Sequence, residues 1–350
     1  MMPNTKVFSI LLGVCLLGYN LAQCAPFPDN KKTEAIDHYH VGGEGGWDLI
    51  TFDAQHHRLF VSRSTHVQVI DTDSGKVIGD IPNTAGVHGI ALADELGVGF
   101  TSNGKSNSVT VFDLTTLNVI DTIKISGLNP DVILYEPKSK HIFTFNGHSQ
   151  NATVIDAVSH KEVDTIALSG KPELAVSDDA GNVFVNIEDT SQVVVIDGNH
   201  NKVIKTFSLG KGIEPTGLSI DKTHHRLFSV CANKKMEILD SESGKIVAEV
   251  AIGAEPDSSA FDAHLGLAFS SNSDGTLTVV QEQGDDHYTV VKNVITQKGA
   301  RTMAYDQDRH RAYLVAASFG ETTPVTIEHP KPKPAIIPNS FVVLGVSFAP

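Results

Sequence analysis

The amino-acid sequence predicts an all-β protein, a seven-bladed β-propeller built from four-stranded antiparallel blades. Three observations predict it. Two sequence markers recur with one common period, strand and turn signals fill each period, and no window shows helical periodicity over three turns. Repeats of this length that each form one small antiparallel sheet are typical of propellers.

The first marker is an apolar pair followed by Asp, as in "VID" at 69–71 and "VFD" at 111–113. Its last residues fall at 71, 113, 156, 197 and 240 and, in the degenerate "VVQ", at 281, a spacing of 41 to 43. The second marker is a short opener with the same period. The openers "GWD", "VHG", "NPD", "KPE", "EPT", "EPD" and "ART" end at 48, 89, 131, 173, 216, 257 and 302. Seven openers predict seven blades.

The fourth unit shows how strands fill one period. "ELAVS", "VFVNI" and "VVVID" are short apolar runs, and "KVIKTFSL" alternates as a half-buried strand does. The segments "DDAGN", "EDTSQ" and "GNHN" separate these runs and are rich in the residues that form turns. Each unit is therefore expected to contain four antiparallel strands.

The two ends of the chain predict how the ring closes. The last unit has only three strand signals, whereas residues 34–41, "EAIDHYHV", precede the first unit and align with the outer strand "KVIKTFSL". We expect this N-terminal strand to complete the last blade, which leaves no exposed strand edge. Residues 321–338 interrupt the last blade with five prolines and are expected to form an extended surface loop. This loop is either a tolerated insertion or a Pro-rich segment that a protein partner binds.

The first residues predict export. Lys6 precedes an apolar run at 7–17 and a polar, small-residue region up to residue 25, so residues 1–25 are interpreted as a signal peptide and 26–350 as one propeller domain. The apolar run is too short to span a membrane. Gln23 is a poor residue before a lipidated Cys24, which disfavours a lipid anchor. The sequence thus predicts a periplasmic or secreted protein.

Composition excludes several classes of function. The formal charge is −14 and there is no Lys/Arg block, so nucleic-acid binding is not expected. Cys231 is the one thiol left after the signal peptide, so there is no disulfide framework, and a buried cysteine is expected to be a packing residue. No CxxCH sequence attaches a haem, and neither GxSxG nor a P-loop is present. We expect a monomer.

The repeats resemble the YVTN-type β-propellers, the exported YncE-like family. The resemblance rests on "VIDTDSGKVIGDIP", "VFDLTTLNVIDTIKI" and "VIDGNHNKVIKTFSL", each followed by an opener, and it covers nearly all of residues 26–350. It implies the propeller fold and export. It does not imply one activity, because propellers of this kind serve as binding platforms, surface proteins or enzyme domains.

The functional site is expected at one mouth of the central channel. The openers lead into the innermost strands, and the loops between second and third strands emerge on the same face. The openers contribute Trp47, Asp48, His88, Asp131, Glu173, Glu214, Asp257 and Arg301. The loops contribute Arg63, His66, Asn103, Asn146, His148, Asn186, Glu188, Cys231 and Asn272. These residues differ between blades, which is typical of a binding site rather than of a repeated framework.

Several chemistries fit this set. Carboxylates and carbonyls suit Ca²⁺ or Mg²⁺, whereas imidazole with carboxylate suits Zn²⁺ and other transition metals. His88 with Glu173 or Glu214 is an acid/base pair that would serve a metal-assisted lyase or hydrolase, as in streptogramin-lyase-type or lactonase propellers. The main prediction is a binding or scaffold protein that holds a small ligand, a metal or a protein partner at this mouth without catalysis, and the lyase or hydrolase is the alternative. A third interpretation is that these polar groups only bind each other and channel water.

Two further features are assigned structural roles. The stretch "HVGGEGGWDL", residues 40–49, is not expected to bind a phosphate, because no helix follows it. Its glycines are instead expected to let the chain turn tightly from the outer strand to the axis. The histidines in "AQHHRLF", "KTHHRLF" and "QDRHRAY" occupy equivalent turns on the face opposite the predicted mouth. Their recurrence at one repeat position favours a role in the turn.

Overall fold

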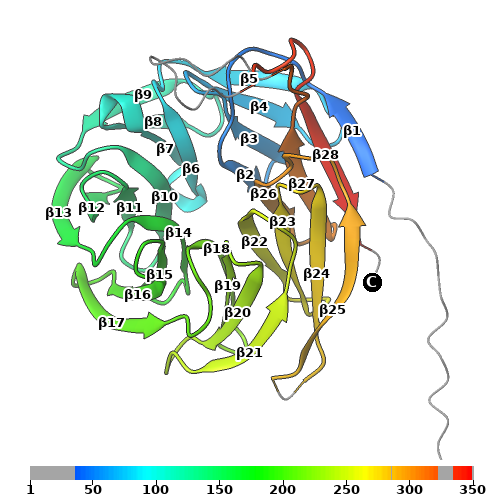
Figure 1. Ribbon diagram of the computed structural model, residues 1–350. Coiled ribbons are helices and arrows are strands. Elements are labelled where there is room, and N and C mark those ends of the chain that lie inside the picture. Colours follow the sequence, from blue (N-terminus) through cyan, green and yellow to red (C-terminus); the bar gives the residue numbers. More distant parts are fainter. Residues whose placement is uncertain (1–35, 285, 322–333, 349–350) are drawn as a thin grey trace, which may run out of the picture. The chain divides into compact units, whose positions relative to one another are not determined.

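Each repeat forms one four-stranded antiparallel sheet, and the seven sheets stand around a central axis (Figure 1). The computed structural model describes residues 36–284, 286–321 and 334–348, which belong to one unit that spans Glu34–Pro350. The predicted signal peptide and residues 322–333 of the Pro-rich insertion lie outside the described residues. The predicted fold class is confirmed.

The strands follow one order in every blade, from the axis outward. Blade one consists of β2 (Ile50–Asp53), β3 (Arg58–Ser62), β4 (Val67–Asp71) and β5 (Val77–Ile81). Blade two consists of β6 (Val87–Ala93), β7 (Val98–Asn103), β8 (Ser108–Asp113) and β9 (Val119–Lys124). Blade three consists of β10 (Pro130–Glu136), β11 (His141–Asn146), β12 (Asn151–Asp156) and β13 (Lys161–Ala167). Blade four consists of β14 (Pro172–Ser177), β15 (Asn182–Ile187), β16 (Gln192–Asp197) and β17 (Lys202–Ser208). Blade five consists of β18 (Pro215–Asp221), β19 (Arg226–Cys231), β20 (Lys235–Asp240) and β21 (Ile246–Ala251). Blade six consists of β22 (Pro256–Asp262), β23 (Leu267–Asn272), β24 (Thr276–Glu282) and β25 (Tyr288–Ile295).

Blade seven is assembled from both ends of the described chain. It contains β26 (Met303–Asp306), β27 (Arg311–Ala316), β28 (Val342–Ser347) and β1 (Ile36–His40), in that order from the axis. The two helical turns among the described residues, η1 (Asp94–Leu96) and η2 (Gly104–Ser106), connect strands of blade two. None of the described helical segments is long and apolar enough to cross a membrane.

The hydrophobic core lies between the blades. The second and third strands carry the apolar runs and are buried almost throughout, whereas outer strands such as β9 are mostly exposed. One apolar cluster joins Phe60 and Val69 of blade one to Ile90 and Phe112 of blade two. Each sheet therefore buries both faces only when its two neighbours are present, which makes the ring a cooperative unit.

A bulge interrupts the start of most innermost strands. The register shifts between Val87 and Ile90 in β6, and equivalent shifts occur in β10, β14, β18 and β22. A bulge bends the strand and re-aims the side chains that it contains. The opener residues lie in these bulges, at the mouth of the channel.

The predicted closing strand is confirmed. β1 pairs antiparallel with β28 from Ile36 opposite Val346 to His40 opposite Val342. The base of the insertion is also fixed, because Phe319 and Ile336 form a β-bridge and the Gly320 amide donates to the Ala335 carbonyl.

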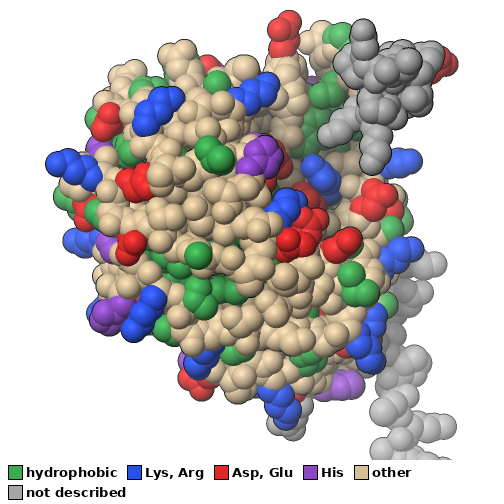
Figure 2. All heavy atoms as spheres, turned by 60° about the vertical axis from the view of Figure 1, so that its left-hand side comes forward, with side chains coloured by type: hydrophobic (Ala, Val, Ile, Leu, Met, Phe, Trp, Pro, Cys, Tyr) green, Lys and Arg blue, Asp and Glu red, His purple; other side chains and the backbone are tan. Residues whose placement is uncertain are grey.

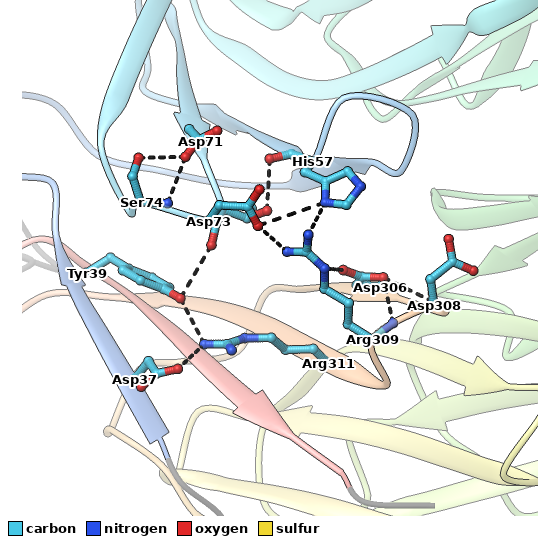
Figure 3. Close-up of polar contacts among 11 residues, drawn as sticks. Asp37, Tyr39, His57, Asp71, Asp73, Ser74, Asp306, Asp308, Arg309 and Arg311 are labelled. Carbon is cyan, nitrogen blue, oxygen red and sulfur yellow. Dashed lines mark hydrogen bonds and ion pairs between the residues drawn. The ribbon is translucent and has the colours of Figure 1, made fainter.

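Polar contacts tie β1, blade seven and blade one together (Figure 3). Arg311 of β27 pairs with Asp37 of β1, and its guanidinium also donates to the Tyr39 hydroxyl at 2.9 Å. Arg309, in the turn before β27, contacts Asp73 and His57 of blade one. These contacts cross the junction between the two ends of the described chain.

We expect the Arg311→Ala substitution to loosen this junction. Because both of its partners on β1 are lost, amide hydrogen exchange at Ile36–His40 should become faster, and the free energy of unfolding should fall by about 1 kcal/mol. Arg226→Ala is the matched control, since Arg226 also begins a second strand but pairs with Asp240 and Asp286. Unchanged exchange at Ile36–His40 in Arg311→Ala would show that Arg311 does not hold β1.

Candidate functional site at the channel mouth

One equivalent position of each blade provides a ring of seven side chains at the channel mouth. In each blade, this position lies two residues before a residue of the innermost strand that pairs with the second strand. In blade one that residue is Ile50, which pairs with Val61, and in blade seven it is Met303, which pairs with Leu314. The seven residues at this position are Asp48, His88, Asp131, Glu173, Thr216, Asp257 and Arg301. The ring thus combines four carboxylates, an imidazole, a hydroxyl and a guanidinium.

A pocket of about 410 Å³ lies inside this ring. Six of the seven ring residues line it, together with Lys171, Glu188, Glu255 and Ser273. Leu49, Val132 and Leu174 form its apolar part, and Leu49 packs against the core cluster of blades three and four. The pocket therefore combines a small apolar part with a highly charged rim.

His88 lies between two ring carboxylates. Its Nδ1 is 2.6 Å from Asp48 Oδ2 and 3.6 Å from Asp131 Oδ1. Its Nε2 faces Gly104, where a Cβ atom would lie only 2.7 Å from that nitrogen. Burial lowers the pKa of His88, but the hydrogen bond to Asp48 and the charge of Asp131 outweigh this effect and raise it. The ring therefore favours the protonated imidazole.

Lys171 is the centre of a second group of charges. Its Nζ donates to Glu173 Oε1 at 2.5 Å and also pairs with Glu188. These two carboxylates raise the pKa of Lys171 despite the opposing effect of its burial. Across the mouth, Arg301 lies 3.6 Å from Asp257. Both cations of the pocket are thus already neutralised by carboxylates.

Negative charge nevertheless predominates in the pocket. Six carboxylates line it, those of Asp48, Asp131, Glu173, Glu188, Glu255 and Asp257, against the two cations Lys171 and Arg301, and they still outnumber the cations when the protonated His88 beside Asp48 is included.

Crowding and burial raise the pKa values of three carboxylates of the pocket. Burial, with the charges of Asp131 and Glu188, raises the pKa of Glu173 to about 7 although Lys171 opposes this. Burial likewise raises the pKa of Asp257 to about 6, against the effect of Arg301. The pKa of Asp131 is also raised, chiefly by burial. Carboxylates with raised pKa values in a pocket are typical of functional sites. Figure 2 shows one face of the propeller on which Asp and Glu side chains gather beside Lys or Arg.

The structure brings seven of the predicted residues to the mouth. Six are the ring residues Asp48, His88, Asp131, Glu173, Asp257 and Arg301, and the seventh is Glu188, which follows β15. Whether they bind a ligand remains a prediction.

The expectation that three asparagines would line the mouth is corrected. Asn103, Asn146 and Asn272 each end a second strand and are fully buried. Each bonds to Thr or Ser side chains of its own blade; Asn146, for example, donates to Thr153 Oγ1 at 2.9 Å. They therefore stabilise the sheet, because at this position the side chain is covered by the neighbouring strands. Asn186 is buried too, and donates to the Thr216 and Gly217 carbonyls.

Arg63 and Trp47 are also corrected to structural positions. The buried Arg63 guanidinium donates to the carbonyls of Gly42, Glu44 and Gly45 and lies 3.8 Å above the Phe341 ring. Gly42, Gly43 and Gly45 have positive φ values of 58°, 85° and 90°, and this conformation points the carbonyls at the arginine. Trp47 packs on Phe341 and Phe319. The glycine-rich stretch therefore encloses a cation of its own chain.

The other predicted residues do not line the pocket. His66 lies 3.6 Å from Asp80, His148 is exposed, and Cys231 is fully buried beside Glu237, with burial raising the pKa of its thiol to about 12. Glu214 is exposed and has a positive φ of 52°. In the fifth blade Thr216, two residues further on, occupies the ring position.

Sequence reasoning missed Thr216, Lys171 and Glu255. Thr216 could have been found from the repeat, since it holds the same place in "EPT" as Asp131 in "NPD". Lys171 and Glu255 precede the prolines of their openers, and the side chains at this position line the pocket in some blades and not in others. No sequence signal distinguishes the two cases.

Comparisons with known proteins support the fold. No family model and no curated protein matches the chain. Among solved structures, Kuenenia stuttgartiensis hydrazine synthase is similar, with 18% identity, a TM-score of 0.67, and coverage of 78% of this chain and 93% of that chain. A structure of U3-55K has 10% identity and a TM-score of 0.72, with coverage of 89% and 98%. The WD40 repeats of RRP9 have 10% identity and a TM-score of 0.74, with coverage of 90% and 99%. At these identities the likeness shows the propeller fold alone.

Because the pKa of Glu173 is raised, this carboxyl is predicted to lower the free energy of unfolding as the pH rises. The pKa of this carboxyl rises from 4.5 to about 7 on folding, so the folded state binds its proton more tightly than the unfolded state. Stability from this group is therefore highest below pH 4.5 and is lost as pH rises to about 7. Because Glu173→Gln also removes the ion pair with Lys171, linkage fixes the difference between two pH values: relative to wild type, the free energy of unfolding of Glu173→Gln should be higher by about 1–2 kcal/mol at pH 8 than at pH 5.

Urea unfolding at the two pH values measures this difference. Glu214→Gln is the control, because this carboxyl is exposed and lies outside the pocket. An equal effect of Glu173→Gln at both pH values would contradict the assignment.

Proposed function

We propose that the protein is an exported binding protein whose ligand is a small cation held in the channel-mouth pocket. The observation that carries this proposal is the imbalance of six carboxylates against two cations in a pocket of about 410 Å³. The raised pKa values of Glu173, Asp257 and Asp131 mean that ionising all of them together is costly. A bound cation would offset that cost, so the pocket favours positively charged ligands.

The pocket's other features suit an organic cation. Leu49, Val132 and Leu174 offer apolar surface to a carbon skeleton, while the ring carboxylates accept hydrogen bonds from an ammonium group. Arg301, half exposed at the rim, can bind an anionic end of the same ligand. Export is supported by the residues at 1–25 and by the resemblance to the YncE-like family.

A second candidate is a metal-assisted lyase or hydrolase at the same mouth. It is favoured by Asp48, His88 and Asp131, which each place one ligand-capable atom within 4.8 Å of the others. One imidazole and two carboxylates suit a divalent transition metal. In that case Glu173, with its pKa of about 7, would be available as an acid or base near the metal.

Calorimetry with small amines tests the first candidate. We expect a polyamine or quaternary amine to bind, and Asp131→Asn to weaken binding at least tenfold, whereas Glu214→Gln should not. At pH 6.5 binding should release protons, because the cation lowers the pKa of Glu173 and Asp257, which are partly protonated at this pH. The measured heat should therefore depend on the ionisation enthalpy of the buffer. Cation binding without proton release would argue against a site at these carboxylates.

Metal analysis separates the two candidates. If the mouth binds a metal, Zn²⁺ or Mn²⁺ should raise the melting temperature, and both His88→Ala and Asp48→Asn should abolish the shift. If the ligand is an organic cation, His88→Ala should instead leave amine binding within a few-fold of wild type, because a protonated His88 adds no attraction for a cation. A metal-induced shift that survives in both variants would exclude this ring as the metal site.

A further inference from the structure

Two histidines from neighbouring blades meet on the face opposite the mouth. His264 lies in the turn between β22 and β23, and His310 lies in the turn between β26 and β27. From their geometry we propose that they form a binding site for a divalent transition metal, with Asp262 as the residue that orients His310. This site is separate from the mouth and does not depend on the function proposed there.

Asp262 is fixed in place by four hydrogen bonds. Its carboxylate is fully buried and accepts from the backbone amides of His264 and Leu265, both at 2.9 Å. Its Oδ2 also accepts from the Tyr305 hydroxyl and from His310 Nδ1, both at 2.7 Å. A carboxylate with so many donors holds the ring of His310 in one orientation.

The bond to Asp262 decides which nitrogen of His310 is free. Because Oδ2 is an acceptor, Nδ1 of His310 carries the proton, and Nε2 therefore keeps its lone pair. A histidine that donates its other ring N–H to a carboxylate is the usual arrangement of a metal-binding histidine, because the carboxylate orients the ring and increases its basicity. Asp262 thus prepares His310 to bind a metal through Nε2.

The two imidazole rings have the spacing of ligands to one metal. Their centroids are 5.8 Å apart and their planes are inclined by 89°. Two imidazoles on one tetrahedral metal, with metal–nitrogen bonds of about 2.1 Å, place their ring centroids roughly 5.5 Å apart. One ligand-capable atom each from Asp262, His264 and His310 lies within 4.8 Å of the others. His264 is exposed, and metal binding requires its ring to rotate so that one of its nitrogens faces Nε2 of His310.

Equivalent turns in other blades lack this arrangement. His57 and His225 hold the repeat position of His310, but the blades that precede theirs have Asp308 and Ala180 where blade six has His264. Among the described residues, the other candidate on this face is Asp221, His224 and Glu282, which offers one imidazole only. The pairing of two imidazoles across blades six and seven therefore does not follow from the repeat. Imidazole ligands select Zn²⁺, Cu²⁺ or Ni²⁺ over Ca²⁺ and Mg²⁺.

Titration with Zn²⁺ alone tests the proposal. The His88→Ala variant serves as the background, so that the mouth contributes no imidazole to any binding. We expect one Zn²⁺ per chain at this site and a loss of affinity of at least tenfold in His264→Ala. His264 is exposed, and its ring makes no hydrogen bond among the described residues, so this variant should fold as the background does. His225→Ala is the matched control and should not alter the affinity.

A second measurement identifies the ligands. Cu²⁺ bound in place of Zn²⁺ should show coupling to two imidazole nitrogens in its electron paramagnetic resonance spectrum, and to one in His264→Ala. Equal Zn²⁺ affinity with and without His264, or a copper spectrum that His264→Ala does not change, would overturn the proposal. So would the absence of Zn²⁺ binding in the His88→Ala background.

Discussion

The packing of each blade between two neighbours is the constraint on which the whole structure depends. An isolated four-stranded sheet of this size would leave apolar faces open, as the cluster shared by Phe60, Ile90 and Phe112 shows. Only a closed ring covers every face, and the ring closes because β1 completes the sheet of β26, β27 and β28. Closure also sets the diameter of the channel mouth. The distances among ring residues from different blades follow from it.

Within this ring, the repeated framework and the variable site occupy adjacent positions. The end of the second strand carries a buried network that recurs, with Asn103, Asn146 and Asn272 each bonded to a threonine in the third strand. The ring position before the first strand, which lies in a bulge in five of the seven blades, carries a different residue in every blade but the three with Asp. The bulge points its side chain at the axis, where no neighbouring strand restricts it. Variation is therefore tolerated there, and a ligand site can be assembled from seven blades.

The mouth concentrates like charges at a cost to the free protein. Asp131, Glu173 and Asp257 would each ionise more readily in water than in this pocket. Groups whose pKa values are shifted in this way cluster at functional sites. On the opposite face, the carboxylates are used differently. Asp53, Asp221 and Asp262 accept hydrogen bonds from their own turns, so the charge there stabilises the framework, and only at Asp262 does the same carboxylate also hold a histidine of the next blade.

By itself, the sequence determined the number of blades, their four strands and the closing strand at 34–41, because these depend on hydrophobic periodicity and turn chemistry, which are local properties. It also identified six of the seven ring residues. Only the tertiary structure decided which polar side chains face the channel. Asn146 and Asp131 both lie at the mouth end of their strands, yet Asn146 is covered between strands while Asp131 projects from a bulge. Likewise, Arg63 is enclosed by glycine carbonyls, and His264 meets His310 across two blades. Such directions and distances arise when separate repeats pack together, and a single repeat carries no signal for them.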